Sequence, residues 1–166
     1  MTAGPTYTPI ATTTLASSAS SYTFTSIPST YTDLVLVGTY TSNAATQTVN
    51  LTVNGDTSTN YSFTYINGDG TSAASSRSTS DNRFAVGWTG TSTTNLENNF
   101  ICSLQNYANT TTYKTFLSRA NSPSRLVTAF VGLWRSTSAI NSISFTPGGN
   151  NFIAGSTFTL YGISSA

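Results

Sequence analysis

The segment Asp33-Leu34-Val35-Leu36-Val37-Gly38-Thr39-Tyr40 decides the fold class. Successive side chains of a β-strand point to opposite faces, so the run Leu34–Val37 makes both faces of this segment apolar. A strand that is apolar on both faces is typical of the interior of a sheet whose two sides are both covered. The segment therefore predicts a central strand covered on both sides.

Short β-rich runs, separated by turn residues, recur on both sides of this segment. Val49, Leu51 and Val53 alternate with polar residues, as expected for a strand with one buried face. No segment keeps the helical spacing of apolar residues together with capping residues. The runs predict an all-β fold of about ten antiparallel strands, as in a sandwich or jelly roll: Ile10–Leu15, Tyr22–Ile27, Asp33–Tyr40, Val49–Val53, Tyr61–Tyr65, Arg83–Trp88, Asn99–Tyr107, Tyr113–Arg119, Leu126–Trp134, Ile140–Phe145 and Thr157–Ile163.

The chain length suits one domain. Residues 1–10 are expected to form a short extended N-terminal arm, and residues 11–166 a single β-sandwich domain of jelly-roll type. The polar stretches 71–82 and 90–95 are predicted as loops. Asn54-Gly55-Asp56 is predicted as a turn, because Asn and Gly tolerate a positive φ.

Composition narrows the class of protein. Hydrophobic residues make up 37% and aromatic residues 12%, too much for a disordered chain. Charged residues are only 7%, against about 25% in a typical soluble domain. The net charge of +1 gives no basic surface for nucleic acid or for an anionic membrane. No apolar run approaches the roughly 18 residues of a membrane span, and the N-terminus does not resemble a signal peptide.

The residues that usually carry catalysis are scarce. The chain has no histidine, which removes the Ser-His-Asp and Cys-His systems and the commonest metal ligand. We therefore expect no enzyme activity, no catalytic residues, no cofactor and no metal. A carboxylate pair for glycoside hydrolysis is the remaining catalytic alternative, and calcium at the turn Asn67–Gly70 the remaining metal alternative. Turns and loops are the favoured interpretation of all five acids: Asp33, Asp56, Asp69, Asp81 and Glu97. Cys102, the only cysteine, is expected to be a buried thiol.

The two tryptophans are the candidates for a ligand or an interface. Trp88 and Trp134 can stack on a sugar ring, and so can the tyrosines Tyr61, Tyr65 and Tyr107. Sandwich cores and subunit interfaces use the same residue types, so burial is favoured over ligand stacking.

Four stretches, which together cover most of residues 24–163, resemble the small virion proteins of tailed phages, cyanophages especially. The stretches are Phe24–Val37, Val53–Ser62, Asn106–Lys114 and Trp134–Ile163. The resemblance implies a β-sandwich or jelly-roll module, expected to be a homotrimer, which decorates the head or forms part of a tail or fibre. The family supplies no catalytic residues to carry over.

The resulting expectation is a capsid decoration or cement protein on the exterior of the virion, made in the host cytoplasm and released by lysis. Its partners would be the major capsid protein and further copies of itself, with Pro5, Tyr7 and Pro9 of the arm as contact residues. The alternative is a tail-fibre or receptor-binding module for cell-surface glycans. That site would use Trp88, Trp134 and the loop residues 67–82 and 90–98.

Overall fold

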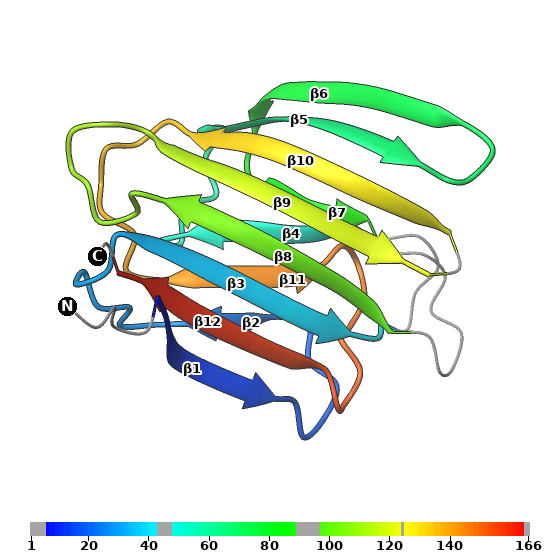
Figure 1. Cartoon of the computed structure of the whole chain (residues 1–166), viewed down its shortest axis with the longest axis horizontal. Coiled ribbons are helices and arrows are strands. Elements are labelled where there is room, and N and C mark those ends of the chain that lie inside the picture. Colours follow the sequence, from blue (N-terminus) through cyan, green and yellow to red (C-terminus); the bar gives the residue numbers. More distant parts are fainter. Residues whose placement is uncertain (1–5, 43–47, 89–96, 124, 165–166) are drawn as a thin grey trace.

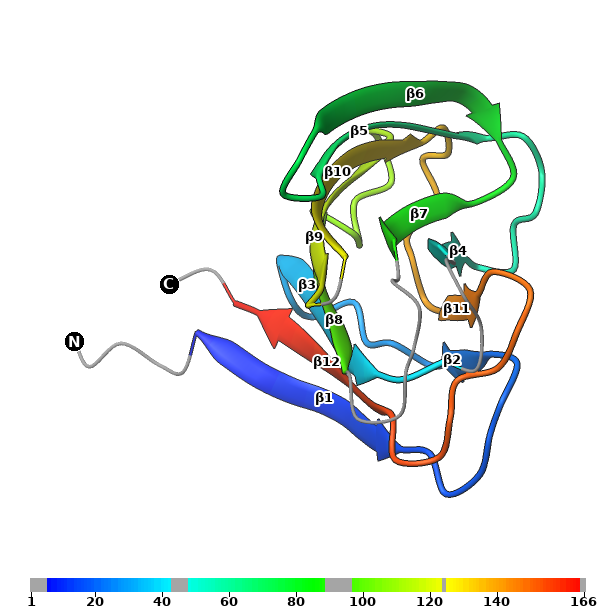
Figure 2. The same cartoon turned by 90° about the vertical axis from the view of Figure 1, so that its right-hand side faces the viewer.

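The computed structural model describes residues 6–42, 48–88, 97–123 and 125–164. They form two packed antiparallel sheets (Figures 1 and 2). The large sheet has eight strands in the order β1-β12-β3-β8-β9-β10-β5-β6, and the small sheet has four in the order β2-β11-β4-β7. The residues described contain no helix with the length and hydropathy of a membrane span. The strands are β1 (Tyr7–Thr14), β2 (Tyr22–Phe24), β3 (Asp33–Tyr40), β4 (Thr48–Val53), β5 (Tyr61–Gly68), β6 (Ala73–Asp81), β7 (Phe84–Trp88), β8 (Asn98–Gln105), β9 (Lys114–Ser122), β10 (Leu126–Trp134), β11 (Ile143–Pro147) and β12 (Thr157–Ile163).

Phenylalanine fills the space between the two sheets. Of the nine phenylalanines in the chain, eight are buried, and the ninth, Phe63, packs against them. The ring centroids of Phe145 and Phe158 lie 4.4 Å apart, which joins β11 of the small sheet to β12 of the large one. Phe84 and Phe116 stack at 5.0 Å and join β7 to β9. Aromatic pairs at these separations add to the free energy gained from burial.

The all-β fold predicted from the sequence is confirmed. The bounds predicted for the third, tenth and twelfth strands match β3, β10 and β12. As predicted, β3 lies inside its sheet, between β12 and β8. The prediction of cover on both sides is wrong within the described part of the chain. Leu34 and Leu36 are fully buried on the side of the small sheet, whereas no second layer of described strands lies on the other side of β3 (Figure 2). On that side Val37 is partly exposed, and Val35 is 8% exposed.

The prediction of a loop over residues 71–82 is wrong, because most of this range forms strand β6. β6 pairs with β5 along its length and forms one edge of the large sheet (Figure 1). Its side chains are almost all exposed, so no apolar face is needed and the sequence shows no hydrophobic alternation. Backbone pairing alone makes this segment a strand.

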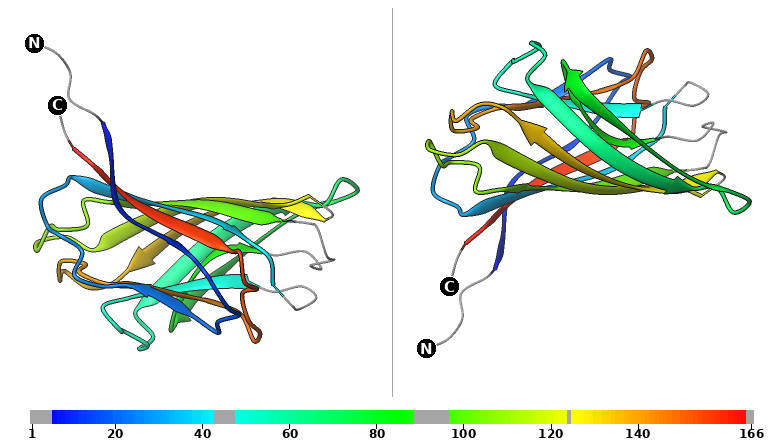
Figure 3. Two further views of the ribbon diagram at one scale, coloured as in Figure 1. Left: turned by 90° about the horizontal axis from the view of Figure 1, so that it is seen from below. Right: turned by 90° about the horizontal axis from the view of Figure 1, so that it is seen from above.

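The prediction of an extended arm over residues 1–10 is wrong from Tyr7 onward. Residues 1–5 lie outside the described residues. From Tyr7 onward the chain is strand β1, which pairs with β12, with Tyr7 opposite Ile163. Figure 3 shows β1 running beside β12 along the edge of the large sheet. The sandwich therefore begins at Tyr7 rather than at residue 11.

Gly132 in β10 allows the closest approach of the two sheets near β7. A Cβ atom at this position would overlap Cε2 and Cδ2 of the Phe84 ring. Overpacking of a core costs about 1–3 kcal/mol. We therefore expect Gly132→Ala to lower the free energy of unfolding, measured by chemical denaturation, by about 2 kcal/mol.

Gly68→Ala is the matched control, because it changes a glycine of the neighbouring strand β5. A Cβ atom there has no neighbour nearer than the Ser72 carbonyl oxygen at 4.0 Å. The free energy of unfolding of this variant should stay within about 1 kcal/mol of the parent. Equal destabilisation of the two variants would show that contact with Phe84 is not the cause.

Candidate functional site

The outer face of the large sheet, which is the side turned away from the small sheet, carries exposed apolar side chains. Among the described residues, six large hydrophobic side chains are more than half exposed, and five of them lie on this face. Their positions follow from the strand registers, in which Val127 faces Asn121, Val131 faces Leu117, and Ile66 faces Ala129. The five are Tyr7, Ile66, Leu117, Val127 and Val131.

The middle of the outer face continues the apolar surface across the sheet. One row of paired residues runs from β12 to β5. Its members are Thr159, Val37, Ile101, Arg119, Ala129 and Ile66. A parallel row contains Val35 and Leu117. Contiguous apolar surface of this kind marks an interaction site more often than scattered exposed side chains do.

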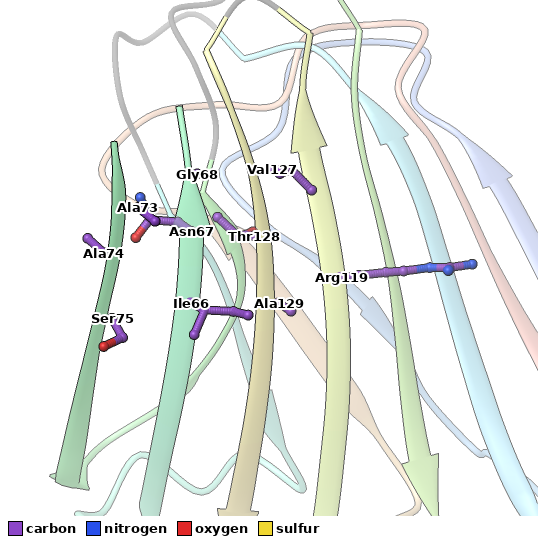
Figure 4. A pocket seen from close by; sticks show the side chains of 10 residues that line it. All are labelled: Ile66, Asn67, Gly68, Ala73, Ala74, Ser75, Arg119, Val127, Thr128 and Ala129. Atoms are coloured by element: carbon purple, nitrogen blue, oxygen red, sulfur yellow. The ribbon is translucent and has the colours of Figure 1, made fainter. Parts of the chain in front are cut away.

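A shallow groove of about 580 Å³ lies on the outer face near the β5–β6 hairpin. Ile66 and Val127 supply its apolar side chains, and Ala73 and Ala129 keep it open by being small. In Figure 4 the side chain of Arg119 points away from the groove and across β8. The groove can accommodate an apolar side chain of a partner, and it presents few polar groups for a small polar ligand.

Two of the three predicted contact residues of the arm belong to the same face. Tyr7 pairs with Ile163 and Pro9 with Tyr161, so all four side chains lie on the outer face. Tyr7 is 58% exposed, and its ring meets that of Tyr161 edge-on with centroids 6.1 Å apart. The third predicted residue, Pro5, lies outside the described residues.

The second hollow is a cleft of about 280 Å³ between the open edges of the two sheets. β4 and β7 of the small sheet form one wall, and the β5–β6 hairpin forms the other. Trp88 is half-buried there, with its ring centroid 5.3 Å from that of Tyr65, which in turn lies 5.0 Å from Phe130. Asn50, Ser76, Ser78, Asp81 and Arg83 supply polar groups to the lining.

Trp134 is part of the core and does not lie at this cleft. Its side chain is 3% exposed, and its ring stacks on Tyr61 with centroids 6.4 Å apart. The indole Nε1 donates a hydrogen bond of 2.7 Å to Oδ2 of Asp56. The two tryptophans therefore do not share a site, and burial, which the sequence favoured, is confirmed for Trp134.

The three candidate tyrosines also fail to form one face. Tyr61 and Tyr107 are fully buried, whereas Tyr65 lines the cleft. The Tyr61 hydroxyl donates to the Asp56 carbonyl oxygen at 3.1 Å and accepts from the Val53 amide at 3.0 Å. Tyr107 donates its hydroxyl proton to the Pro28 carbonyl oxygen. These hydroxyls hold loops to the core.

Asp56 ties the turn between β4 and β5 to the core. The turn forms as predicted, with φ of 52° at Asn54 and 68° at Gly55. The Asp56 carboxylate accepts hydrogen bonds from the Ser58 amide at 2.8 Å and from Asn60 Nδ2 at 2.9 Å, besides that from Trp134. Partial burial alone raises the pKa of Asp56, but the hydrogen bonds outweigh it and lower the pKa from 3.8 to about 2.

The other three aspartates hold backbone groups in the same manner. Asp33 accepts from the Asn106 amide at 2.6 Å, and Asp81 from the Asn82 amide at 2.8 Å. Asp69 accepts from the amides of Ser72 and Thr71, which hold its pKa well below the usual range. Asp69 thus closes the β5–β6 hairpin. Among the described residues, no three His, Cys, Asp or Glu side chains gather as a metal site.

Lys114 and Cys102 are both buried in the sandwich. Lys114 Nζ donates to the carbonyl oxygens of Thr112 at 2.8 Å and Thr137 at 3.2 Å, and burial lowers the pKa of its ammonium group. Cys102 is fully buried, as expected, and burial raises the pKa of its thiol. A thiol in this environment has little thiolate with which to react.

The exposed apolar side chains of the outer face were not predicted from the sequence. Strand β10 contains the available signal, because both of its alternating sets of side chains include large apolar residues. Leu126 and Phe130 point inward, and Val127 and Val131 point outward. The same pattern in β3 led to the prediction of a strand covered on both sides.

Comparison with solved structures shows only a weak similarity of fold between this chain and known proteins. No protein-family model and no curated protein matches the chain. Exo-inulinase from Aspergillus awamori is 15% identical over 95% of this chain, with a TM-score of 0.46, and the match spans only 29% of the inulinase chain. The PL-14 alginate lyase from Aplysia kurodai is 10% identical, with a TM-score of 0.36, over 84% of this chain and 72% of the lyase. The homodimeric agglutinin CG-16 from chicken liver is 16% identical, with a TM-score of 0.36, over 83% of this chain and 98% of the agglutinin. None of these likenesses carries an argument about function.

The depressed pKa of Asp56 predicts a loss of stability in acid. Its folded-state pKa of about 2 lies below the ordinary value of 3.8, so the ionised form stabilises the fold. This contribution is fully present above about pH 4 and is lost as the pH falls towards 2. Asp56→Asn should lower the free energy of unfolding at pH 6 by about 1 kcal/mol, a value reduced for solvent screening.

Denaturation followed by tryptophan fluorescence at pH 6, 4, 3 and 2 measures this effect. The difference between Asp56→Asn and the parent should shrink steadily below pH 4, because protonation removes the same charge from the parent. A difference that stays constant from pH 6 to pH 2 would show that the carboxylate charge plays no part.

Proposed function

We propose that this chain is a non-catalytic structural protein on the exterior of a phage particle, attached to the capsid by the outer face of its large sheet. One observation carries this proposal. β3 is apolar on both faces, and the described part of the chain places a second sheet against only one of them, so that Val37 on the other face stays partly exposed. Val37 and the exposed side chains of β9, β10 and β5 therefore form an apolar surface suited to a partner protein.

The assignment to a phage particle is supported by the resemblance of residues 24–163 to small virion proteins. The major capsid protein is the proposed occupant of the outer face, and copies of the chain are proposed to associate as a homotrimer. The face carries few charges, chiefly Arg119 and Arg77. A contact made of apolar and hydroxyl groups keeps its strength as the salt concentration changes. Tyr7 and Pro9 extend this contact surface to the edge of the sheet.

Val131→Asp tests the outer face directly. Val131 is 53% exposed, so the charge is tolerated by the isolated domain, and the free energy of unfolding should change little. In the complex, the carboxylate would be buried without a partner. Binding to heads assembled without this protein, measured by co-sedimentation, should weaken at least tenfold, or about 1.4 kcal/mol.

Thr23→Asp is the control for this measurement. Thr23 is exposed on β2 of the small sheet, on the opposite side of the sandwich. The Thr23→Asp substitution adds the same charge as Val131→Asp and should leave binding to the heads unchanged. Normal co-sedimentation of Val131→Asp would contradict the proposed attachment by the outer face.

A cryo-electron map of the intact particle tests the location on the virion. Decoration predicts many copies at fixed positions on the head, with β9 and β10 facing the shell. Density for this fold only at the tail would contradict a role on the head.

Recognition of cell-surface glycans is the second candidate function, and the cleft at Trp88 favours it. The indole is held half-exposed against Tyr65, next to polar side chains, which is an arrangement suited to a sugar ring. Residues 90–96 of the predicted glycan site lie outside the described residues, and Trp134 is buried in the core. Of the two tryptophans, Trp88 alone is placed to contact a glycan.

A further inference from the structure

We propose that the cleft between β7 and the β5–β6 hairpin binds a carboxylated sugar, such as a uronate or a sialate. This inference rests on the second candidate function and specifies the class of glycan. Its basis is the pairing of a fixed aromatic ring with the Arg83 guanidinium, which has no partner among the described residues.

The aromatic side of the cleft is rigid. Phe130 is buried in the core, Tyr65 packs on Phe130, and Trp88 packs on Tyr65 with an interplanar angle of 44°. This row of rings fixes the orientation of the indole before any ligand arrives. Binding then costs little side-chain entropy, and the apolar face of a sugar ring can lie on the indole.

The cationic side of the cleft is formed by Arg83, because the register places the side chain of Arg77 on the outer face. The Arg83 guanidinium makes no hydrogen bond or ion pair with the part of the chain that the structure describes. Arg135 differs, because its Nη2 donates to the carbonyl oxygens of Thr59, Tyr61 and Thr79 at 3.0–3.2 Å. Arg135 is therefore engaged in holding the fold, while Arg83 retains its donors for a ligand. A guanidinium fork matches a carboxylate in shape and charge.

The remaining polar groups suit hydroxyl groups of a sugar. Asn50 is 6% exposed at the floor of the cleft, and its Nδ2 makes only a long hydrogen bond of 3.5 Å to the Thr48 carbonyl oxygen. The Asp81 carboxylate is engaged by Ser78 Oγ at 3.3 Å and by the Asn82 amide. Both oxygens of the Asp81 carboxylate already accept hydrogen bonds, so Arg83 is the charged group of the lining with donors left for a ligand, which favours an acidic ligand over a neutral one.

The test compares acidic sugars with neutral sugars of the same linkage. Isothermal titration calorimetry with the full chain would use trigalacturonate and its carboxyl-reduced form, and 3′-sialyllactose and lactose. We expect at least one acidic sugar to bind at least tenfold more tightly than its neutral counterpart. That preference should fall as the salt concentration rises.

Two substitutions separate the cationic and the aromatic contributions. Arg83→Gln should remove the preference for the acidic sugar, and Arg119→Gln, an exposed arginine on the outer face, should leave it unchanged. Trp88→Ala should abolish binding of the acidic sugar. If Trp88→Ala disturbs the fold, Trp88→Phe should keep the fold and weaken binding by a smaller factor.

Each outcome bears on a different claim. Equal affinity for the acidic and neutral sugars would overturn the inference while leaving glycan recognition in place. Binding of none of the four sugars would overturn the inference and the second candidate function together. Attachment by the outer face is decided separately by Val131→Asp, because that residue does not line the cleft.

Discussion

The packing of phenylalanine rings between two sheets of unequal size determines the rest of the structure. Phe145 and Phe158 join the sheets at one end, and Phe84 and Phe116 join them at the other. A four-stranded sheet can bury only one face of an eight-stranded sheet, and it cannot reach the last strand, β6. Two surfaces therefore stay open. One is the whole outer face of the large sheet, and the other is the gap between the edges β6 and β7.

The open outer face has a different chemistry from the outer face of the small sheet. On the small sheet, Thr23 and Ser144 face solvent and share a hydrogen bond of 2.9 Å, as is usual for a solvated sheet surface. On the large sheet, the equivalent positions in β9 and β10 hold Leu117, Val127 and Val131. Exposed apolar surface of this extent lowers solubility unless a partner covers it. This contrast within one molecule supports a binding role for the large sheet.

The sequence specified most of the fold, because most strands carry the side chains that reveal them. Alternation or a two-sided apolar run identified eleven of the twelve strands, including the bounds of β3, β10 and β12. β6 was missed because neither of its faces is buried, so its Ser- and Thr-rich sequence carries no hydrophobic pattern. β6 pairs with β5 through backbone hydrogen bonds, and the pattern of its side chains does not predict this pairing. The start of β1 was missed because Pro9, an unusual residue for a strand, is tolerated at a sheet edge.

The candidate sites were harder to predict than the strands. Two apolar faces on one strand do not reveal whether the second layer comes from the same chain or from a partner, so the outer face was not recognised from β3 alone. The cleft brings Trp88 of β7 together with Tyr65 of β5, and a contact across two sheets leaves no spacing in the sequence. Trp134 was a candidate for a ligand-binding surface because tryptophan is common at such sites. In the structure its ring is buried, and the hydrogen bond from its indole to Asp56 satisfies the only polar group of the side chain.

The positions of the two open surfaces make the two candidate functions compatible. The outer face lies on the side of the large sheet that is turned away from the small one, whereas the cleft opens between the sheets, at the edge formed by β6 and β7. A chain attached by its outer face would therefore leave the cleft in contact with solvent. Attachment depends on apolar side chains that do not change charge, while ligand binding in the cleft depends on the charge of Arg83, so salt would weaken ligand binding without releasing the protein. The same fold can in this way separate a permanent contact from a reversible one.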